Sequence, residues 1–204
     1  MPVYYTNPQS RGQIAHWMLE ETGEPYETKV VGYDELGDPA FRLVNPMGKI
    51  PALVDGGHVV TECAAIVAYL AHRYPEKDLG PRPEEAADYF RWLFFTAGPV
   101  EQAVVSKAMG WTIDDPGRQR MLGFGDFERP LTVLAQHLSE RDWVCGQRFT
   151  AADVYVGSQV DWGLQFGTFP PLPPFERYAE RLRARPAYQR TKAINAALMD
   201  QAKA

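Results

Sequence analysis

Cysteine and long apolar runs are both scarce in this sequence, and their scarcity limits the classes of protein that it can encode. The two cysteines, Cys63 and Cys145, form no CxxC pair and no repeated spacing, so they indicate neither a disulfide framework nor a zinc site. No apolar run approaches the length of a membrane span. The start of the chain lacks the basic and apolar regions of a secretory signal, so we expect a protein of the reducing cytoplasm.

Basic residues are also in deficit. Lysine and arginine number 21 against 26 aspartates and glutamates, and the formal net charge of −5 disfavours nucleic acid or an anionic membrane as the main partner. No metal is expected, because the four histidines lack the spacing of metal ligands: His16, His58, His72 and His137. Apolar residues, in contrast, make up 45% of the 204 residues, which is ample for the core of one large or two small domains.

The first part of the chain alternates short strand patterns with helical patterns. Strands are predicted at residues 3–5, 26–31, 52–54 and 58–60, and helices are predicted to follow Ser10, Asp38 and Thr61. The order strand, helix, strand, helix, strand, strand, helix resembles a thioredoxin-like domain, to which we assign residues 1–77. Tyr5 ends the first strand and is expected to face the core.

The second part of the chain shows only helical patterns. Residues 78–84 are predicted to be a linker, and residues 85–204 an all-helical domain, so the fold class is α/β plus all-α. Gly98-Pro99 should kink or break one long helix, and Asp115-Pro116 should cap the next, which carries apolar positions as far as Leu138. The sequence from Thr150 to Asp153 is typical of a capping box, and PPLPP at 170–174 of a stiff connection.

The stretch from Asn45 to Ile66, NPMGKIPALVDGGHVVTECAAI, is the most informative part of the sequence. Pro51 marks the start of a strand, because proline lacks the N–H that a central ladder needs. The bond before Pro51 is also the place where a cis peptide is expected. The DGG segment supplies the glycines of a hairpin turn, and a helix is predicted to begin at Glu62-Cys63.

This arrangement suits a ligand with a peptide backbone at one end and an amino-acid head at the other. The backbone groups of Ile50 can pair with an extended peptide. The free N–H groups at the helix start near Cys63 suit a carboxylate, and the Glu62 carboxylate suits an ammonium group. Glutathione has both features.

The segments NPMGKIPAL and TECAAI resemble the glutathione-binding half of the cytosolic glutathione S-transferase superfamily, in its bacterial, theta- or beta-like branch. The resemblance covers nearly the whole chain. It implies a homodimer that conjugates glutathione, as co-substrate and without a metal, to small hydrophobic electrophiles. It also implies that glutathione is bound by five residues: Lys49, Ile50, Pro51, Glu62 and Cys63. Cys63 stands where the family usually has serine, so a strong hydroxyl donor is lost while the backbone N–H remains.

Such a reaction requires a thiol that ionises near neutral pH. Lowering a thiol pKa from ~8.5 by about two takes roughly 2.7 kcal/mol of preferential thiolate stabilisation. Hydrogen-bond donors in the loop after the first strand are suited to this task. Ser10 is the leading candidate, since its segment SRG resembles one bacterial branch, and Asn7 and Thr6 are the alternatives. Ser10 could instead simply cap the helix that follows it.

Two further questions stay open at the level of sequence. The same resemblance is compatible with glutathione-dependent peroxide reduction, isomerisation or dehalogenation, and with a glutathione-binding stress-response protein of little catalytic activity. Four aromatic residues of the helical part are expected to pack mostly in the core, with one or two lining an apolar electrophile pocket: Trp111, Trp162, Phe166 and Phe169.

Overall fold

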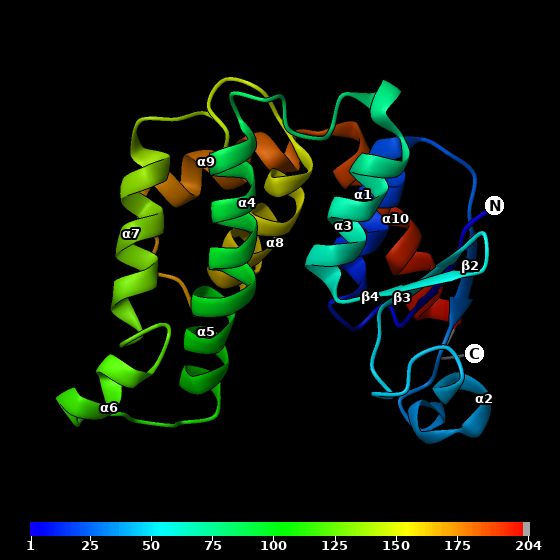
Figure 1. Ribbon diagram of the computed structural model, residues 1–204, viewed down its shortest axis with the longest axis horizontal. Helices are drawn as coiled ribbons and strands as arrows, with labels where there is room; N and C mark the ends of the chain where they lie inside the picture. The colour runs from blue at the N-terminus through cyan, green and yellow to red at the C-terminus, as the bar shows by residue number, and fades with distance from the viewer. Residues whose placement is uncertain (202–204) are drawn as a thin grey trace. The chain divides into compact units, whose positions relative to one another are not determined.

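The computed structural model describes residues 1–201, whose contacts divide the chain into two compact units (Figure 1). The first unit comprises Met1–Gly80 together with the segment from Arg183 to the end of the described residues, and the second comprises Pro81–Leu182. The last helix therefore packs with the N-terminal residues. The division proposed from sequence, with a linker at 78–84 and a helical domain from 85 onward, stays a prediction.

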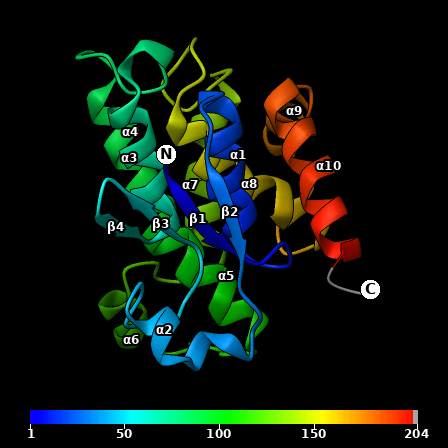
Figure 2. The ribbon, with the colours of Figure 1, turned by 90° about the vertical axis from the view of Figure 1, so that its right-hand side faces the viewer.

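The first unit has the predicted thioredoxin-like order of elements. Its strands form one sheet in the order β2-β1-β3-β4, with β1 parallel to β2 and the other neighbours antiparallel (Figure 2). The elements are β1 (Val3–Thr6), α1 (Gly12–Thr22), β2 (Glu27–Val30), a short 3₁₀ turn (Glu35–Gly37), α2 (Pro39–Arg42), β3 (Ala52–Asp55), β4 (His58–Thr61), α3 (Cys63–Arg73), a second 3₁₀ turn (Pro75–Lys77) and, from the far end of the chain, α10 (Pro186–Gln201).

The strand register gathers four chain segments at one edge of this sheet. Thr6 pairs with Val30, Tyr5 pairs with Ala52, and Ala52 pairs with Thr61. β1, β2 and β4 run in one direction and β3 runs in the other. The C-terminal ends of β1, β2 and β4 therefore lie beside the N-terminal start of β3. We call this end of the sheet, where the loops that follow β1, β2 and β4 meet the turn before β3, the loop edge.

Helix α10 is held in the first unit by polar contacts with α1. The buried ring of His16 hydrogen-bonds through Nδ1 with Asn195 Oδ1 (3.1 Å) and through Nε2 with the Tyr26 hydroxyl (2.7 Å), and burial lowers the pKa of His16. Arg185 donates two hydrogen bonds of 2.7 Å to the Glu21 carboxylate. The sequence pattern had not connected α1 with α10, because His16 and Asn195, like Glu21 and Arg185, lie more than 160 positions apart.

Within the described residues, helices are the regular elements of the second unit, joined by loops and one isolated bridge between Trp143 and Gly146. Helix α8 forms its centre, and every residue from Ala151 to Asp161 is buried. The helices are α4 (Ala86–Phe95), a π-helical turn (Thr96–Val100), α5 (Glu101–Ala108), α6 (Pro116–Met121), α7 (Glu128–Ser139), α8 (Ala151–Gln165) and α9 (Pro173–Arg183).

Two predictions about these helices need comparison with the structure. Of the kink or break predicted at Gly98-Pro99, the break is wrong, because the helix continues through the π-helical turn, whose wider winding accommodates a residue without an N–H. The single helix expected from Asp115 to Leu138 is wrong. Asp115 does cap α6, since its Oδ1 accepts from Arg118 N at 2.7 Å, but that helix ends at Met121 and a new one begins at Glu128.

The capping box at the start of α8 is confirmed. Both oxygens of the fully buried Asp153 carboxylate are used: Oδ2 accepts from Thr150 N (2.8 Å), and Oδ1 accepts from Val144 N (2.7 Å) and from the Tyr178 hydroxyl (2.7 Å). Burial raises the pKa of Asp153 to about 6, and these donated bonds oppose that rise. The cap therefore joins α8 to α9 as well as starting a helix.

Replacement of Gly12 by alanine tests the packing beneath the first loop. A Cβ atom at Gly12 would lie 2.0 Å from Thr6 Oγ1 and 2.9 Å from the Tyr4 hydroxyl. Because both of these groups are buried, Gly12→Ala is expected to lower the free energy of unfolding by about 1–3 kcal/mol, measured by chemical denaturation. Gly37→Ala is the matched control, since no atom lies within 4 Å of a Cβ there. Equal stability of the two variants would contradict this view of the packing.

Candidate functional site

The first loop, Asn7–Arg11, leaves the sheet at the loop edge and is built around Ser10. The Ser10 hydroxyl donates to Asn7 O (2.7 Å) and accepts from Gly12 N (3.0 Å), so it caps the start of α1. The side chain is half-buried. A hydroxyl that accepts a hydrogen bond from the backbone can still rotate its own proton towards another acceptor. The cap and the predicted role as donor to a thiolate are therefore compatible.

The other two residues predicted to act in catalysis are occupied within the fold. The Asn7 amide donates from Nδ2 to Val31 O (3.1 Å) and accepts at Oδ1 from Gln9 N (2.9 Å), so both ends of the amide shape the loop. Thr6 is fully buried, and its hydroxyl hydrogen-bonds with the Tyr4 hydroxyl at 3.0 Å. The structure thus places Thr6 in the core.

Tyr4, rather than Tyr5, is the tyrosine of β1 that faces the core. Tyr4 is fully buried, whereas Tyr5 is half-buried, with its ring 6.0 Å from that of Phe41. The Tyr4 hydroxyl also hydrogen-bonds with the carbonyl of Gly12 at the start of α1. Burial raises the pKa of Tyr4 well above its usual value, so this phenol stays neutral.

The turn before Pro51 is shaped by the buried side chain of Asn45. Asn45 Nδ2 donates to Lys49 O (2.7 Å), and Oδ1 accepts from Met47 N (3.1 Å). The Ile50–Pro51 peptide bond is cis. Within residues 1–201, neither the N–H nor the carbonyl of Ile50 forms a hydrogen bond. Ile50 therefore presents unused main-chain groups at the loop edge, and the Lys49 side chain beside it is exposed.

Glu62 and Cys63 at the start of α3 differ sharply in environment. Glu62 is exposed, has no ion pair within the described part of the chain, and has φ 64° and ψ 119°, a backbone conformation that side chains with a Cβ rarely adopt. Cys63 is buried, and its thiol donates to Arg11 O across 3.3 Å. The first loop and the start of α3 are therefore in direct contact.

Comparison with known proteins gives a consistent picture. The family described as glutathione S-transferase, N-terminal domain, matches residues 5–78, and the corresponding C-terminal domain family matches residues 120–186. The glutathione S-transferase GstA of Escherichia coli O157:H7 is 30% identical over 171 residues, which cover 79% of this chain and 82% of that protein. The chain belongs to the cytosolic glutathione S-transferase superfamily.

Two further relatives bear on the site of this transferase. A theta class glutathione S-transferase from Xanthomonas axonopodis pv. citri, solved with glutathione bound, is 30% identical, with coverage of 93% of this chain and 96% of that one and a TM-score of 0.73. A maleylacetoacetate isomerase of Pseudomonas aeruginosa is 28% identical over 164 residues, 77% of each chain.

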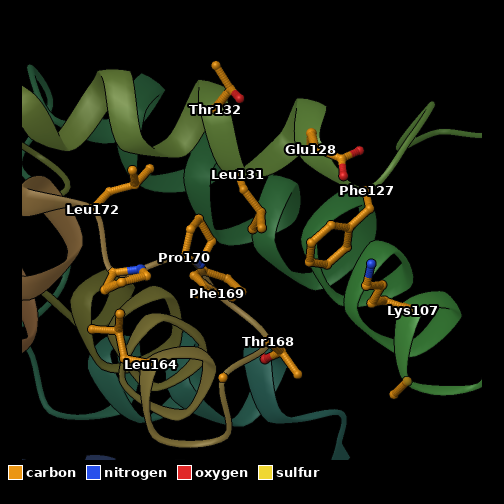
Figure 3. A pocket seen from close by; sticks show the side chains of 13 residues that line it. Lys107, Phe127, Glu128, Leu131, Thr132, Leu164, Thr168, Phe169, Pro170 and Leu172 are labelled. Atoms are coloured by element: carbon orange, nitrogen blue, oxygen red, sulfur yellow. The ribbon is translucent and has the colours of Figure 1, made fainter.

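The helical unit of the transferase contains a cavity of about 770 Å³ (Figure 3). Buried Leu131 and Phe169 line it, Lys107 and Glu128 lie towards one end, and the first half of the PPLPP segment, Pro170–Leu172, forms one wall. Of the four aromatic residues singled out in the sequence, only Phe169 lines this cavity. Trp162 is half-buried, and Trp111 and Phe166 are exposed, so core packing was the wrong expectation for the last two.

Within residues 1–201, no group of three or more histidine, cysteine, aspartate or glutamate side chains could hold a metal ion. Across the same residues, no helix combines the length and apolar character needed to cross a membrane.

Sequence reasoning overlooked one residue of the loop edge, Tyr33, whose hydroxyl donates to Gln9 O at 3.1 Å. A lone tyrosine in a loop carries no signal that could have identified it.

The backbone of Glu62 leads to a stability prediction. Glycine adopts positive φ without the steric cost that a Cβ brings, so Glu62→Gly is expected to raise the free energy of unfolding by about 1 kcal/mol. Ala65→Gly in the exposed interior of α3 is the control, and it should lower that energy by about 0.5–1 kcal/mol. Chemical denaturation measures both. A loss of stability in Glu62→Gly would mean that the unusual conformation carries no strain.

Proposed function

We propose that this protein binds glutathione at the loop edge and conjugates its thiolate to small hydrophobic electrophiles. The observation that carries the proposal is the strand register, which brings the first loop, the turn before Pro51 and the start of α3 to one edge of the sheet. Membership of the superfamily and the bound glutathione of the Xanthomonas relative support the same reading.

The tripeptide meets chemically distinct groups along this edge. The unused main-chain groups of Ile50, held beside Pro51, pair with the cysteinyl portion of glutathione as an added strand would. The exposed carboxylate of Glu62 attracts the α-ammonium group, and the first-turn N–H groups of α3, from Cys63 onward, attract the α-carboxylate. Lys49 supplies positive charge for the carboxylate at the other end.

The thiol between these ends is activated by the first loop. Ser10 turns its proton from Asn7 O to the sulfur, and the hydrogen bond stabilises the thiolate relative to the thiol. The thiolate attacks the electrophile, a carbon–sulfur bond forms, and the leaving group departs with its electron pair. No covalent enzyme intermediate is required, so binding, orientation and thiolate stabilisation account for the rate.

Replacement of Ser10 tests the proposed function. Conjugation of glutathione to chlorodinitrobenzene at pH 6.5 is expected to be measurable for the unaltered protein and about ten- to a hundredfold slower for Ser10→Ala, because each unit in thiol pKa changes the thiolate fraction about tenfold. The KM for glutathione should change less, since Ile50 and Glu62 are untouched. Exposed Ser139, replaced by alanine in α7, is the control. Equal rates with and without the Ser10 hydroxyl would rule out its catalytic role.

Isomerisation is a second candidate, favoured by the relative named maleylacetoacetate isomerase. An activated thiolate can add to a conjugated double bond, allow rotation, and leave again. Glutathione is regenerated by isomerisation and consumed by conjugation, so measuring free thiol during turnover of a cis-enone separates the two.

Binding of immobilised glutathione without turnover of chlorodinitrobenzene, cumene hydroperoxide or a haloalkane would instead support the stress-response binding role.

The proposal includes a cytoplasmic location. Neither Cys63 nor Cys145 forms a disulfide within residues 1–201, which is compatible with a reducing compartment. Burial raises the pKa of the Cys145 thiol to about 12, so this cysteine stays protonated and serves neither as a nucleophile nor as a ready partner in thiol exchange. The reactive sulfur of the proposed reaction is therefore that of glutathione.

A homodimer is also part of the proposal, and α4 offers a surface for it. Phe90 and Phe94 lie four residues apart, so they share one face of the helix, and they are 50% and 68% exposed in the single chain. Exposed apolar side chains that cluster in this way mark interaction surfaces more often than isolated ones do.

The dimer is tested by placing a charge on that face. Phe94→Glu is expected to shift the protein from dimer to monomer in analytical ultracentrifugation, because a buried unpaired carboxylate opposes association. Phe166→Glu is the control, since Phe166 is 75% exposed at the end of α8. A wild-type monomer, or a Phe94→Glu variant that remains dimeric, would exclude this surface as the interface.

A further inference from the structure

The segment that follows β2 holds the first loop from one side. Val31 N donates to Thr6 O (2.7 Å), which extends the pairing of β1 with β2 by one residue. Val31 O accepts from Asn7 Nδ2 (3.1 Å), and the Tyr33 hydroxyl donates to Gln9 O (3.1 Å). Thr6, Asn7 and Gln9 are thus each hydrogen-bonded to the segment formed by residues 31–33.

These attachments reach Ser10 through the backbone of the loop. The Asn7 carbonyl accepts both the Ser10 N–H (3.0 Å) and the Ser10 hydroxyl (2.7 Å). The Asn7 side chain also accepts from Gln9 N (2.9 Å), the residue whose carbonyl Tyr33 holds. A shift of Asn7 or Gln9 would therefore move the Ser10 hydroxyl.

The turn that carries Tyr33 is itself fixed. Glu35 Oε2 accepts from Gly32 N (2.6 Å), and Glu35 N donates to Gly32 O (3.1 Å). A Cβ atom at Gly32 would lie 2.5 Å from Asp34 Oδ1, so the turn is closely packed. Tyr33 therefore extends from a firm support, although its side chain is 56% exposed.

Burial does not explain why a large aromatic side chain stands at this exposed position. The only hydrogen bond recorded for the Tyr33 side chain within the described residues ends on the first loop. Removal of this hydroxyl would leave the core intact, because neither the ring nor the hydroxyl belongs to the buried set. Any effect on catalysis would then report on the loop.

We propose that Tyr33 is a positioning residue for the transferase reaction, which holds Gln9 so that the loop presents the Ser10 hydroxyl to the sulfur of glutathione. The inference rests on the proposed function, because it assigns Tyr33 a role only through Ser10. Tyr33 itself touches neither the thiol nor the electrophile. Asn7 acts in the same way from within the loop, since its amide bonds both Val31 O and Gln9 N.

Tyr33→Phe is the most direct variant, since it removes one oxygen atom from an exposed side chain. The thiolate fraction of bound glutathione, measured by ultraviolet absorbance across a pH titration, is expected to fall about two- to tenfold near neutral pH, the range that one net hydrogen bond accounts for. The rate of conjugation should fall by the same factor, while the KM for glutathione stays unchanged. Tyr69→Phe is the matched control, because its hydroxyl donates to Asp55 Oδ2 (2.9 Å) away from the loop.

A double-mutant cycle with Ser10→Ala shows whether Tyr33 acts through Ser10. Tyr33→Phe should slow conjugation in the protein that has Ser10 and have no further effect in the Ser10→Ala background. Equal losses in both backgrounds, or no loss in either, would overturn the inference while leaving the proposed function intact. Failure of the unaltered protein to bind glutathione would overturn the proposed function and the inference together.

Discussion

The pairing of Ala52 with Tyr5 on one side and with Thr61 on the other is the constraint on which the site depends. This single register fixes where β1 ends, where β3 begins and where β4 ends. A slip of one residue would turn every side chain of a strand to the opposite face, so Tyr4 and Leu53 could not both stay in the core. Stability of the sheet and alignment of the loop edge therefore have the same origin.

Small residues and buried hydroxyls then fix the first loop on that edge. Gly12 lets the start of α1 approach Thr6 and Tyr4, and the Tyr4 hydroxyl holds the Gly12 carbonyl in return. The Cys63 thiol holds the adjacent carbonyl of Arg11. The Cys63 side chain, where the family resemblance leads one to expect serine, thus joins the start of α3 to the first loop, in which Ser10 is the proposed thiolate donor.

The sequence was most informative where local chemistry decides the structure. Proline at position 51, the DGG turn and the capping box at Thr150 each impose a backbone conformation on their neighbours, and each prediction matches the structure. Family resemblance added the ligand. Side-chain roles were less predictable, because they depend on partners far along the chain. Nothing near Asn7 indicates that its amide is bound by Val31.

The helical unit shows the same limit. Asp115 correctly indicated the start of α6. That helix ends at Met121, before a bend in which Gly125 has φ 73°. A glycine among apolar positions does not by itself indicate that a helix ends there. The exposed aromatic residues were assigned to the core because hydrophobicity alone does not show which face of an element meets a neighbour.

A crystal structure of the protein with glutathione tests the central claim most directly. The account predicts the tripeptide along the loop edge, with its main chain paired to Ile50, its amino-acid head at Glu62 and its sulfur within hydrogen-bonding distance of Ser10 Oγ. Glutathione bound elsewhere, or bound at this edge with its sulfur turned away from the first loop, would contradict it.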